Sequence, residues 1–145
     1  MPHLTVPGVL ESLDPIADFV LSEAERAGLE HKARYRLRLA IDEIATNSIL
    51  YGYAARGLTG ELTLSSDLTD SGLTIVLEDN GPPYDPRQRD LEDVEAQFDK
   101  PLEERGMGGL GVYFAVHGVD DFRYERANDR NRNSFTVLRA VVASK

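Results

Sequence analysis

Two periodicities of hydrophobic and polar residues divide this chain into helical and extended segments. Apolar residues recur every three or four positions from Leu13 until Gly28, and again from His31 to about Ala54, which predicts two amphipathic helices. Short β-rich runs bounded by turn residues predict strands elsewhere. The expected strands cover residues 3–8, 61–69, 72–80, 120–128 and 133–143, and short helices are expected at 89–98 and 108–118.

The order of these elements favours one α+β domain over residues 1–145. The segments at 61–80 and 120–143 are predicted to be antiparallel hairpins, with the polar run 128–132 as the turn of the second. Hairpins and grouped helices are typical of a two-layer α/β sandwich and not of a doubly wound parallel sheet. A domain of this length buries roughly 70% of its unfolded surface, so a sizeable core is expected.

A carboxylate and a carboxamide lie beside the apolar stripe of the second helix. Glu43 and Asn47 are one helical turn apart, so both side chains are expected at the same edge of the sandwich. Asn47 offers a neutral oxygen suited to Mg²⁺, and Glu43 can accept a proton from a hydroxyl or water. The alternative is two polar residues on a solvated face. The stripe itself consists of Leu37, Ile41, Ile44, Ser48 and Tyr51.

Composition narrows the classes of partner. The net charge of -9 and the pI near 4.8 argue against nonspecific binding to nucleic acid or to an anionic membrane. The chain has no cysteine, and His3, His31 and His117 are too scattered to indicate a metal site. Neither a leader-like N-terminus nor a bilayer-spanning apolar run is present in the sequence, so a cytoplasmic protein is expected.

A long irregular stretch runs from Gly81 to Gly109, and loops of this length are usually functional or disordered. Near its end, Gly106, Gly108 and Gly111 have G-x-G-x-x-G spacing. The preceding residues are polar and broken by proline, which excludes a dinucleotide-binding strand-turn-helix unit, and no P-loop G-K-[ST] occurs. Glycines before a helix still let backbone N–H groups approach a phosphate; the alternative is a hinge without a ligand.

Asp79 ends an apolar strand in "LEDNGPPYDP", beside a turn of Asn, Gly and Pro residues. A carboxylate at this place can project into a sheltered pocket and accept a hydrogen bond from an exocyclic amine such as that of adenine. The alternative is a simple turn sequence without a ligand.

These elements occur in a fixed order: helical E-x-x-x-N, strand-ending D-x-G-x-P, then a long segment closed by G-x-G-G-x-G. In "DEIATNSILYGY", "EDNGPPYDP" and "ERGMGGLGVYFA" the chain resembles the GHKL superfamily of ATP-binding proteins with the Bergerat fold. Within it the sequence is most similar to anti-sigma factor serine/threonine kinases. The resemblance extends over almost the whole chain and implies a mixed, mostly antiparallel sheet covered on one face by helices, with an ATP lid at about 81–109.

The resemblance also implies roles for individual residues. The Glu at the position of Glu43 is the general base, and the Asn at Asn47 coordinates Mg²⁺ on the ATP phosphates. The Asp at Asp79 bonds the adenine amine, Gly81 allows close approach, and Arg105 is placed to meet the γ-phosphate. The phosphates are expected to be cradled by Gly106, Gly108, Gly109, Leu110 and Gly111.

Two features depart from the family pattern. Many relatives have a Gly-Thr pair in the last strand, near adenine, where this chain offers Asn133, Ser134 or Thr136, and the sequence does not choose among them. The segment 85–105 carries eight carboxylates against four basic residues, which suggests that part of it faces solvent or a protein partner.

The resemblance implies an ATP- and Mg²⁺-dependent serine/threonine protein kinase that phosphorylates an anti-anti-sigma STAS protein and also binds a sigma factor. A homodimer is compatible with it. The alternative function is a non-catalytic anti-sigma module that binds its partner according to the bound nucleotide. Retention of Glu43 favours the kinase, whereas the unusual last strand leaves the alternative open.

Overall fold

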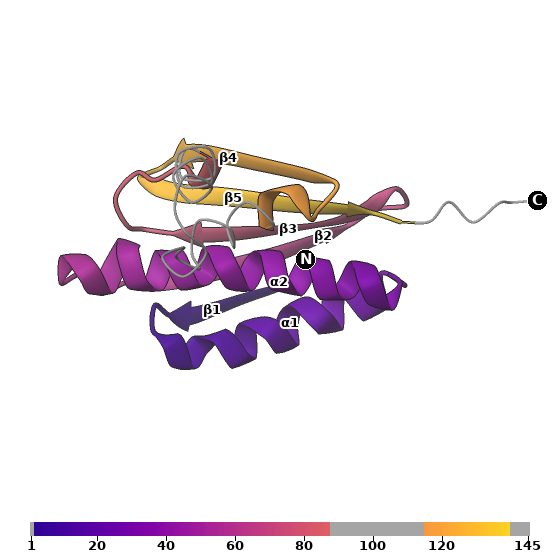
Figure 1. The fold of residues 1–145 in the computed structure, drawn as a ribbon, viewed down its shortest axis with the longest axis horizontal. Coiled ribbons are helices and arrows are strands. Elements are labelled where there is room, and N and C mark those ends of the chain that lie inside the picture. The colour runs from indigo at the N-terminus through magenta and orange to yellow at the C-terminus, as the bar shows by residue number, and fades with distance from the viewer. Residues whose placement is uncertain (1, 88–114, 140–145) are drawn as a thin grey trace, which may run out of the picture.

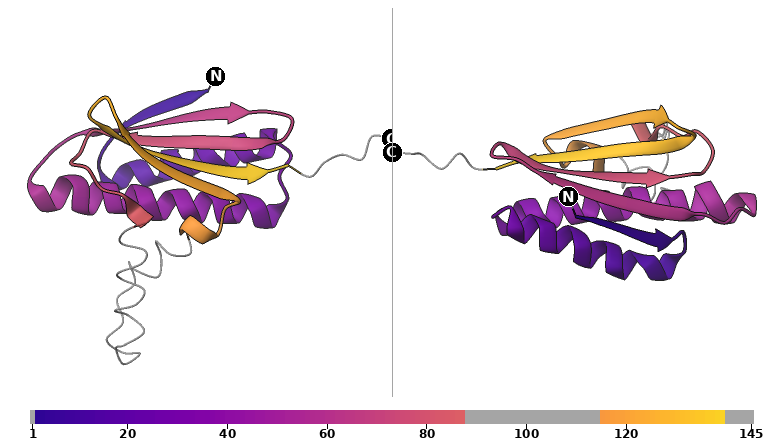
Figure 2. Two further views of the ribbon diagram at one scale, coloured as in Figure 1. Left: turned by 90° about the horizontal axis from the view of Figure 1, so that it is seen from above. Right: turned by 180° about the vertical axis from the view of Figure 1, so that it is seen from behind.

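The computed structural model describes residues 2–87 and 115–139 and shows two layers, a sheet and a pair of helices (Figure 1). Both long helices lie on the same face of the sheet, as the turned views show (Figure 2). In chain order the elements are β1 (His3–Pro7), η1 (Leu10–Ser12), α1 (Leu13–Arg26), α2 (His31–Asn47), η2 (Ser48–Tyr53), η3 (Ala54–Arg56), β2 (Glu61–Leu68), β3 (Gly72–Asp79), β4 (Asp121–Ala127) and β5 (Arg130–Leu138).

The sheet has five strands in the order β1-β2-β3-β5-β4, and every neighbouring pair among them is antiparallel. The predicted α+β sandwich and both hairpins are therefore confirmed, while the parallel pairing implied by a mixed sheet is not found in the described strands. Residues 115–117 are helical, and the rest of the helix expected at 108–118 lies outside the described residues, as does the one at 89–98. In the described part of the chain, no helix has the length and apolar character needed to cross a bilayer.

The core lies between the helices and the inner face of the sheet. Strand residues alternate between buried and partly exposed positions, so one face of the sheet is apolar and the other carries Thr, Ser and charged side chains. Burial of each large aliphatic side chain contributes about 1.5–3 kcal/mol. The largest fully buried side chains are Phe135, Ile16, Leu37, Ile41, Ile44, Leu62, Leu64, Leu73, Ile75, Leu77 and Val20.

The last hairpin turns more tightly than its sequence suggested. Strand β5 begins at Arg130 and not at Asn133, so the expected five-residue turn at 128–132 is wrong. Only Asn128 and Asp129 form the turn; both have positive φ, 54° and 61°, as a two-residue hairpin loop of type I′ requires. The polar residues 130–132 that follow this turn belong to β5, because side chains alternate between buried and partly exposed from Arg130 onward and Asn131 is only 3% exposed.

The second helix does not remain α-helical to Ala54 as expected. α2 ends at Asn47 and is followed by the π-helical η2 and the short 3₁₀ helix η3. A π turn holds more residues than an α turn, so the inward positions shift after Ile44. Ile49 and Tyr53 are each 2% exposed, whereas Tyr51, predicted to continue the apolar stripe, is 46% exposed. The first part of the stripe is confirmed, because Leu37, Ile41 and Ile44 are buried.

Tyr53 fastens the end of this helical segment to the sheet. Its ring packs so closely on two glycines that a Cβ added at Gly8 or Gly60 would lie 2.5 Å from a ring atom. Its hydroxyl lies 2.8 Å from the Glu61 carbonyl and 2.6 Å from Oδ1 of Asn80, and it accepts the Asn80 N–H at 2.9 Å. These contacts place η2 against the ends of β2 and β3.

Candidate functional site

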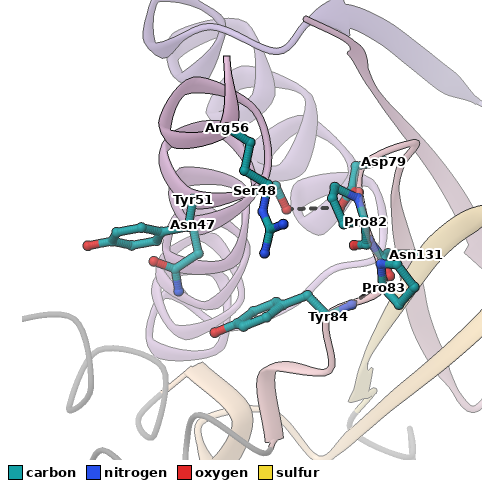
Figure 3. A pocket seen from close by; sticks show the side chains of 10 residues that line it. Asn47, Ser48, Tyr51, Arg56, Asp79, Pro82, Pro83, Tyr84 and Asn131 are labelled. Carbon is teal, nitrogen blue, oxygen red and sulfur yellow. Dashed lines mark hydrogen bonds between the residues drawn. The ribbon is translucent and has the colours of Figure 1, made fainter. Parts of the chain in front are cut away.

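A cavity of about 120 Å³ opens where η2 meets the end of β3 (Figure 3). Three separate parts of the chain form its walls, namely the α2–η3 helical segment, the end of β3 with the loop after it, and β5. Its lining residues are Asn47, Ser48, Tyr51, Gly52, Arg56, Asp79, Pro82, Pro83, Tyr84 and Asn131. Two of the predicted site residues, Asn47 and Asp79, are thus brought together.

Asp79 is 5% exposed and is held by donors from three directions. Its Oδ1 accepts the Gly81 N–H at 2.9 Å and the Asn131 side-chain amide at 2.8 Å, and its Oδ2 accepts the Ser48 hydroxyl at 3.0 Å. An ionised carboxylate has about four acceptor sites, so the fixed Asp79 keeps acceptor capacity for a ligand. The prediction of a sheltered carboxylate at the end of this strand is met by the geometry.

Gly81 supports this carboxylate without lining the cavity. A Cβ at this position would lie 3.2 Å from Oδ1 of Asp79 and 3.6 Å from the Gly52 carbonyl oxygen. Since the same residue donates its N–H to Asp79, a methyl group here would crowd the carboxylate that the loop surrounds, and glycine leaves room for both contacts. The Gly81 carbonyl in turn accepts a bond from Arg126 at 2.7 Å, which ties the loop to β4.

Asn131 is a site residue that the sequence analysis missed. It lies directly opposite Asp79 in the β3–β5 pairing, and its amide donates to Asp79 and to the Pro82 carbonyl, both at 2.8 Å. Its oxygen accepts the Tyr84 N–H at 3.1 Å and the Tyr124 hydroxyl at 2.5 Å. Asn131 therefore uses all its hydrogen-bonding capacity to hold the carboxylate and the loop after β3 in place.

The three candidates in the last strand have different positions. Asn133 faces the helices, is 2% exposed, and has an Oδ1 without a hydrogen-bond partner. Ser134 and Thr136 alternate to the other face, where Thr136 bonds the Thr74 hydroxyl at 2.8 Å and Ser134 borders a hollow beside β4. In the described structure none of the three lines the cavity, and the residue of β5 that does line it is Asn131.

Asn47 brings an unpartnered polar atom to the cavity wall. It is the last residue of α2, 5% exposed, and its Nδ2 makes no hydrogen bond. An unpaired buried polar group costs about 1–3 kcal/mol, so a ligand that pairs with it recovers this energy. A 180° rotation of the amide presents Oδ1 instead, the neutral oxygen that a hard cation prefers.

Glu43 precedes Asn47 by one turn of α2 and is only partly exposed. Its pKa is raised, first because burial disfavours the charged form and second because Asp42 is nearby. Burial also raises the pKa of Asp42 itself, although Arg38 opposes this shift. Glu43 does not line the cavity formed by the described residues.

Arg56 is a second site residue that the sequence did not reveal. It follows η2 in the short helix η3, and its guanidinium points into the middle of the cavity (Figure 3). No hydrogen bond or ion pair involves this side chain in the described structure. An unpaired cation in the cavity of an acidic protein is available for a ligand, either for an anionic group or for the face of an aromatic ring.

The remaining predicted site residues lie outside the described residues. The predicted ATP lid is described only as far as Arg87. Within the described ranges, no group of three or more His, Cys, Asp or Glu side chains could hold a metal ion by itself. The undescribed site residues are Arg105, Gly106, Gly108, Gly109, Leu110 and Gly111.

A family model for the histidine kinase-like ATPase domain matches residues 6–137. The chain belongs to this family. Membership in the histidine kinase-like ATPase family agrees with the antiparallel sheet backed by helices and implies the use of ATP.

Individual relatives agree with this assignment. The serine-protein kinase RsbW of Listeria innocua is 28% identical over 100 residues, which are 69% of this chain and 63% of that protein. RsbW of Bacillus licheniformis is 27% identical over 68% of this chain and 61% of its own. RsbW of Bacillus cereus is 26% identical over 83% of this chain and 74% of its own. The matches to the first two span less than two thirds of those relatives.

Proposed function

We propose that this protein is an ATP-dependent serine/threonine protein kinase and anti-sigma factor that phosphorylates an anti-anti-sigma STAS protein. The observation that carries the proposal is the cavity in which a buried carboxylate, Asp79, and an unpartnered amide, Asn47, lie on opposite walls. Asp79 offers a hydrogen-bond acceptor to an exocyclic amine, and Asn47 offers a polar atom to Mg²⁺ bound to phosphates.

The residues present fit a nucleotide. Asp79 is oriented by Ser48, Gly81 and Asn131, so its remaining acceptor site has a fixed direction and would accept the amine of adenine. Asn47 would hold Mg²⁺ together with oxygens of the phosphates, because the described residues offer no carboxylate cage for the ion. When bound, Mg²⁺ neutralises charge on the phosphates.

Glu43 is the residue to which we assign proton transfer. A general base works best when its pKa lies near the operating pH, and burial moves the pKa of Glu43 upward in that direction. Its carboxylate would accept the proton of the partner's Ser or Thr hydroxyl. Arg56, which points into the cavity, would contact the bound nucleotide as its cationic partner.

The kinase activity and the partners rest on similarity. The relatives are named serine-protein kinases, at 26–28% identity. The STAS protein, the sigma factor and the partner-switching exchange between them are implied by the resemblance of the three motifs.

The rival function is a nucleotide-gated anti-sigma module that transfers no phosphoryl group. The position of Glu43 outside the described cavity lining favours it. Both functions require ATP binding, so binding alone does not separate them.

The deciding experiment incubates the protein with radiolabelled ATP, Mg²⁺ and a candidate STAS protein, and then searches the STAS protein for phosphoserine or phosphothreonine. We expect labelling by the parent protein. We expect Glu43→Ala to bind ATP like the parent but to transfer roughly 10²–10⁴-fold more slowly. If ATP binds and Glu43→Ala labels the STAS protein at the parent rate, Glu43 is not the base.

A further inference from the structure

The exposed side of α2 near its start is strongly cationic in a protein of net charge -9. Residues 31–38 contain four of the chain's 16 Lys and Arg residues, one His and no carboxylate. We call this region the α2 cationic surface; it consists of His31, Lys32, Arg34, Tyr35, Arg36 and Arg38.

The cations in the first turn of α2, Lys32 and Arg34, oppose the stability of their own helix. The first turn of a helix favours negative charge, and each misplaced surface cation costs about 0.3–1 kcal/mol. α2 has no acidic residue in its first turn and no side-chain cap from Glu30. α1 follows the usual rule, with Asp14 in its first turn and Arg26 in its last. The first turn of α2 is therefore less favourable for helix stability than that of α1, and a local choice of this kind points to a role outside the helix.

Internal contacts account for only part of the cationic surface. Arg34 donates to the Leu29 carbonyl at 2.7 Å and Arg38 lies 3.5 Å from Asp42. In the described structure, no hydrogen bond or ion pair involves Lys32 or Arg36.

Two hollows flank this part of α2. One, of about 270 Å³, is bordered by Leu21 and Glu25 of α1 and by Tyr35, which is 57% exposed. The other, of about 200 Å³, lies beside Lys32 and Arg36 and is bordered by Leu138, which is 58% exposed. The hollow beside Tyr35 is mainly apolar, and the hollow beside the unpaired Lys32 and Arg36 is mainly polar. Together they suit a ligand that carries both apolar side chains and carboxylates.

We propose that the α2 cationic surface is the docking site of an acidic, partly apolar segment of a protein partner. Because the rest of the molecule is acidic, such a segment is repelled elsewhere and guided to α2. The surface is short, about 11 Å along the helix axis, and acidic residues border it. A DNA duplex or a membrane extends beyond this short surface and would also contact the carboxylates that border it. These carboxylates are Glu25, Glu30, Asp42 and Asp120.

The docking site is separate from the nucleotide cavity. Arg38, the end of the surface nearest the cavity, comes nine residues before Asn47, a separation of about 14 Å along the helix, and His31 lies about 24 Å from Asn47. A partner on the α2 cationic surface therefore leaves the cavity open. The inference does not depend on ATP binding, and its test contains no nucleotide.

The test uses a fluorescein-labelled helical peptide with Glu on one face and Leu on the other, followed by fluorescence anisotropy at low salt. We expect the parent protein to bind it, with weaker binding as salt rises. The double variant Lys32→Glu/Arg36→Glu should bind at least about tenfold more weakly. Tyr35→Ala should also weaken binding. Arg123→Glu on exposed β4 reverses a single charge, so it is the control for Lys32→Glu and Arg36→Glu tested one at a time, and it should bind like the parent.

Any one of four outcomes would overturn the proposal. The first is that the parent protein does not bind the peptide, and the second is that it binds the Glu→Gln version of the peptide equally well. A DNA duplex or anionic vesicles bind more tightly than the peptide and lose binding in the same double variant. The double variant unfolds at lower urea concentration than the parent, which would give the cations a structural role; the helix dipole predicts equal or greater stability.

Discussion

Replacing Asp79 with asparagine tests the cavity at the atom on which recognition of adenine depends. The substitution keeps the shape of the side chain but turns one oxygen into an N–H donor. In the parent protein Oδ2 accepts the Ser48 hydroxyl, and an amide at this place can donate to the same hydroxyl instead. Oδ1 can still accept from Gly81 and Asn131, so we expect the fold to lose no more than about 1 kcal/mol.

The effect on ATP should be larger. A hydrogen bond to a charged group contributes about 1.5–3 kcal/mol, which corresponds to roughly 10- to 150-fold in Kd. ATP and ADP should lose equal factors, because the lost contact is to the base. The parent should also prefer ATP to inosine triphosphate, whose base has an oxygen in place of the amine, and Asp79→Asn should lose this preference.

Isothermal titration calorimetry with the three nucleotides measures these factors, and Asp121→Asn on exposed β4 is the matched control. Urea unfolding of each variant separates a binding effect from a folding effect. The assignment of the cavity is wrong if Asp79→Asn binds ATP as tightly as the parent, or if its preference over inosine triphosphate is unchanged.

Three further predictions concern the surroundings of the cavity. Arg56→Ala should weaken ATP binding in calorimetry without lowering the urea midpoint, because this side chain makes no hydrogen bond or ion pair in the described structure; unchanged binding would remove Arg56 from the site. Glu43→Gln should stabilise the fold near neutral pH and lose this advantage in acid, because a raised pKa means that ionisation of Glu43 disfavours the folded state as pH rises through it; equal urea midpoints at both pH values would contradict the shift. Gly60→Ala should lower the free energy of unfolding by about 1–3 kcal/mol, since its Cβ would lie 2.5 Å from the ring of Tyr53. The control is Gly52→Ala, whose Cβ would meet no atom within 4 Å and which should change stability less; Gly57, with its φ of 66°, is unsuitable as a control because a side chain there is strained.

Hydrophobic periodicity in the sequence predicted the helix and sheet layers, and with them two of the three walls of the cavity, those from α2 and from the end of β3. The helical stripe from Leu37 to Ile44 and the strand that ends at Asp79 follow simple periods, because one face of each packs on a single core. Asn47 could be placed for the same reason, since it is the last residue of the regular helix.

The missed residues depend on contacts between distant parts of the chain. Asn131 becomes a partner of Asp79 only through the register of β3 and β5, two strands that are distant in the sequence. Residue 131 was also predicted to lie in a turn, whereas the turn consists of Asn128 and Asp129 alone. Arg56 enters the cavity because a π-helical segment rotates the residues that come after it. Such a segment is set by tertiary packing and not by local propensity, so hydrophobic spacing alone misassigned Tyr51 to the core.

The π-helical segment also bears on how this domain can be engineered. Stabilisation by design normally replaces irregular helical turns with regular ones and fills them with strong helix formers. Applied to η2, that procedure would return Tyr51 toward the core and turn Tyr53 away from its partners at the ends of β2 and β3. The redesigned protein would have a more regular helix but would lose the cavity between η2 and the end of β3. In a thermostabilised version of this protein, residues 48–53 should therefore be left unchanged while the surface of α1 is redesigned.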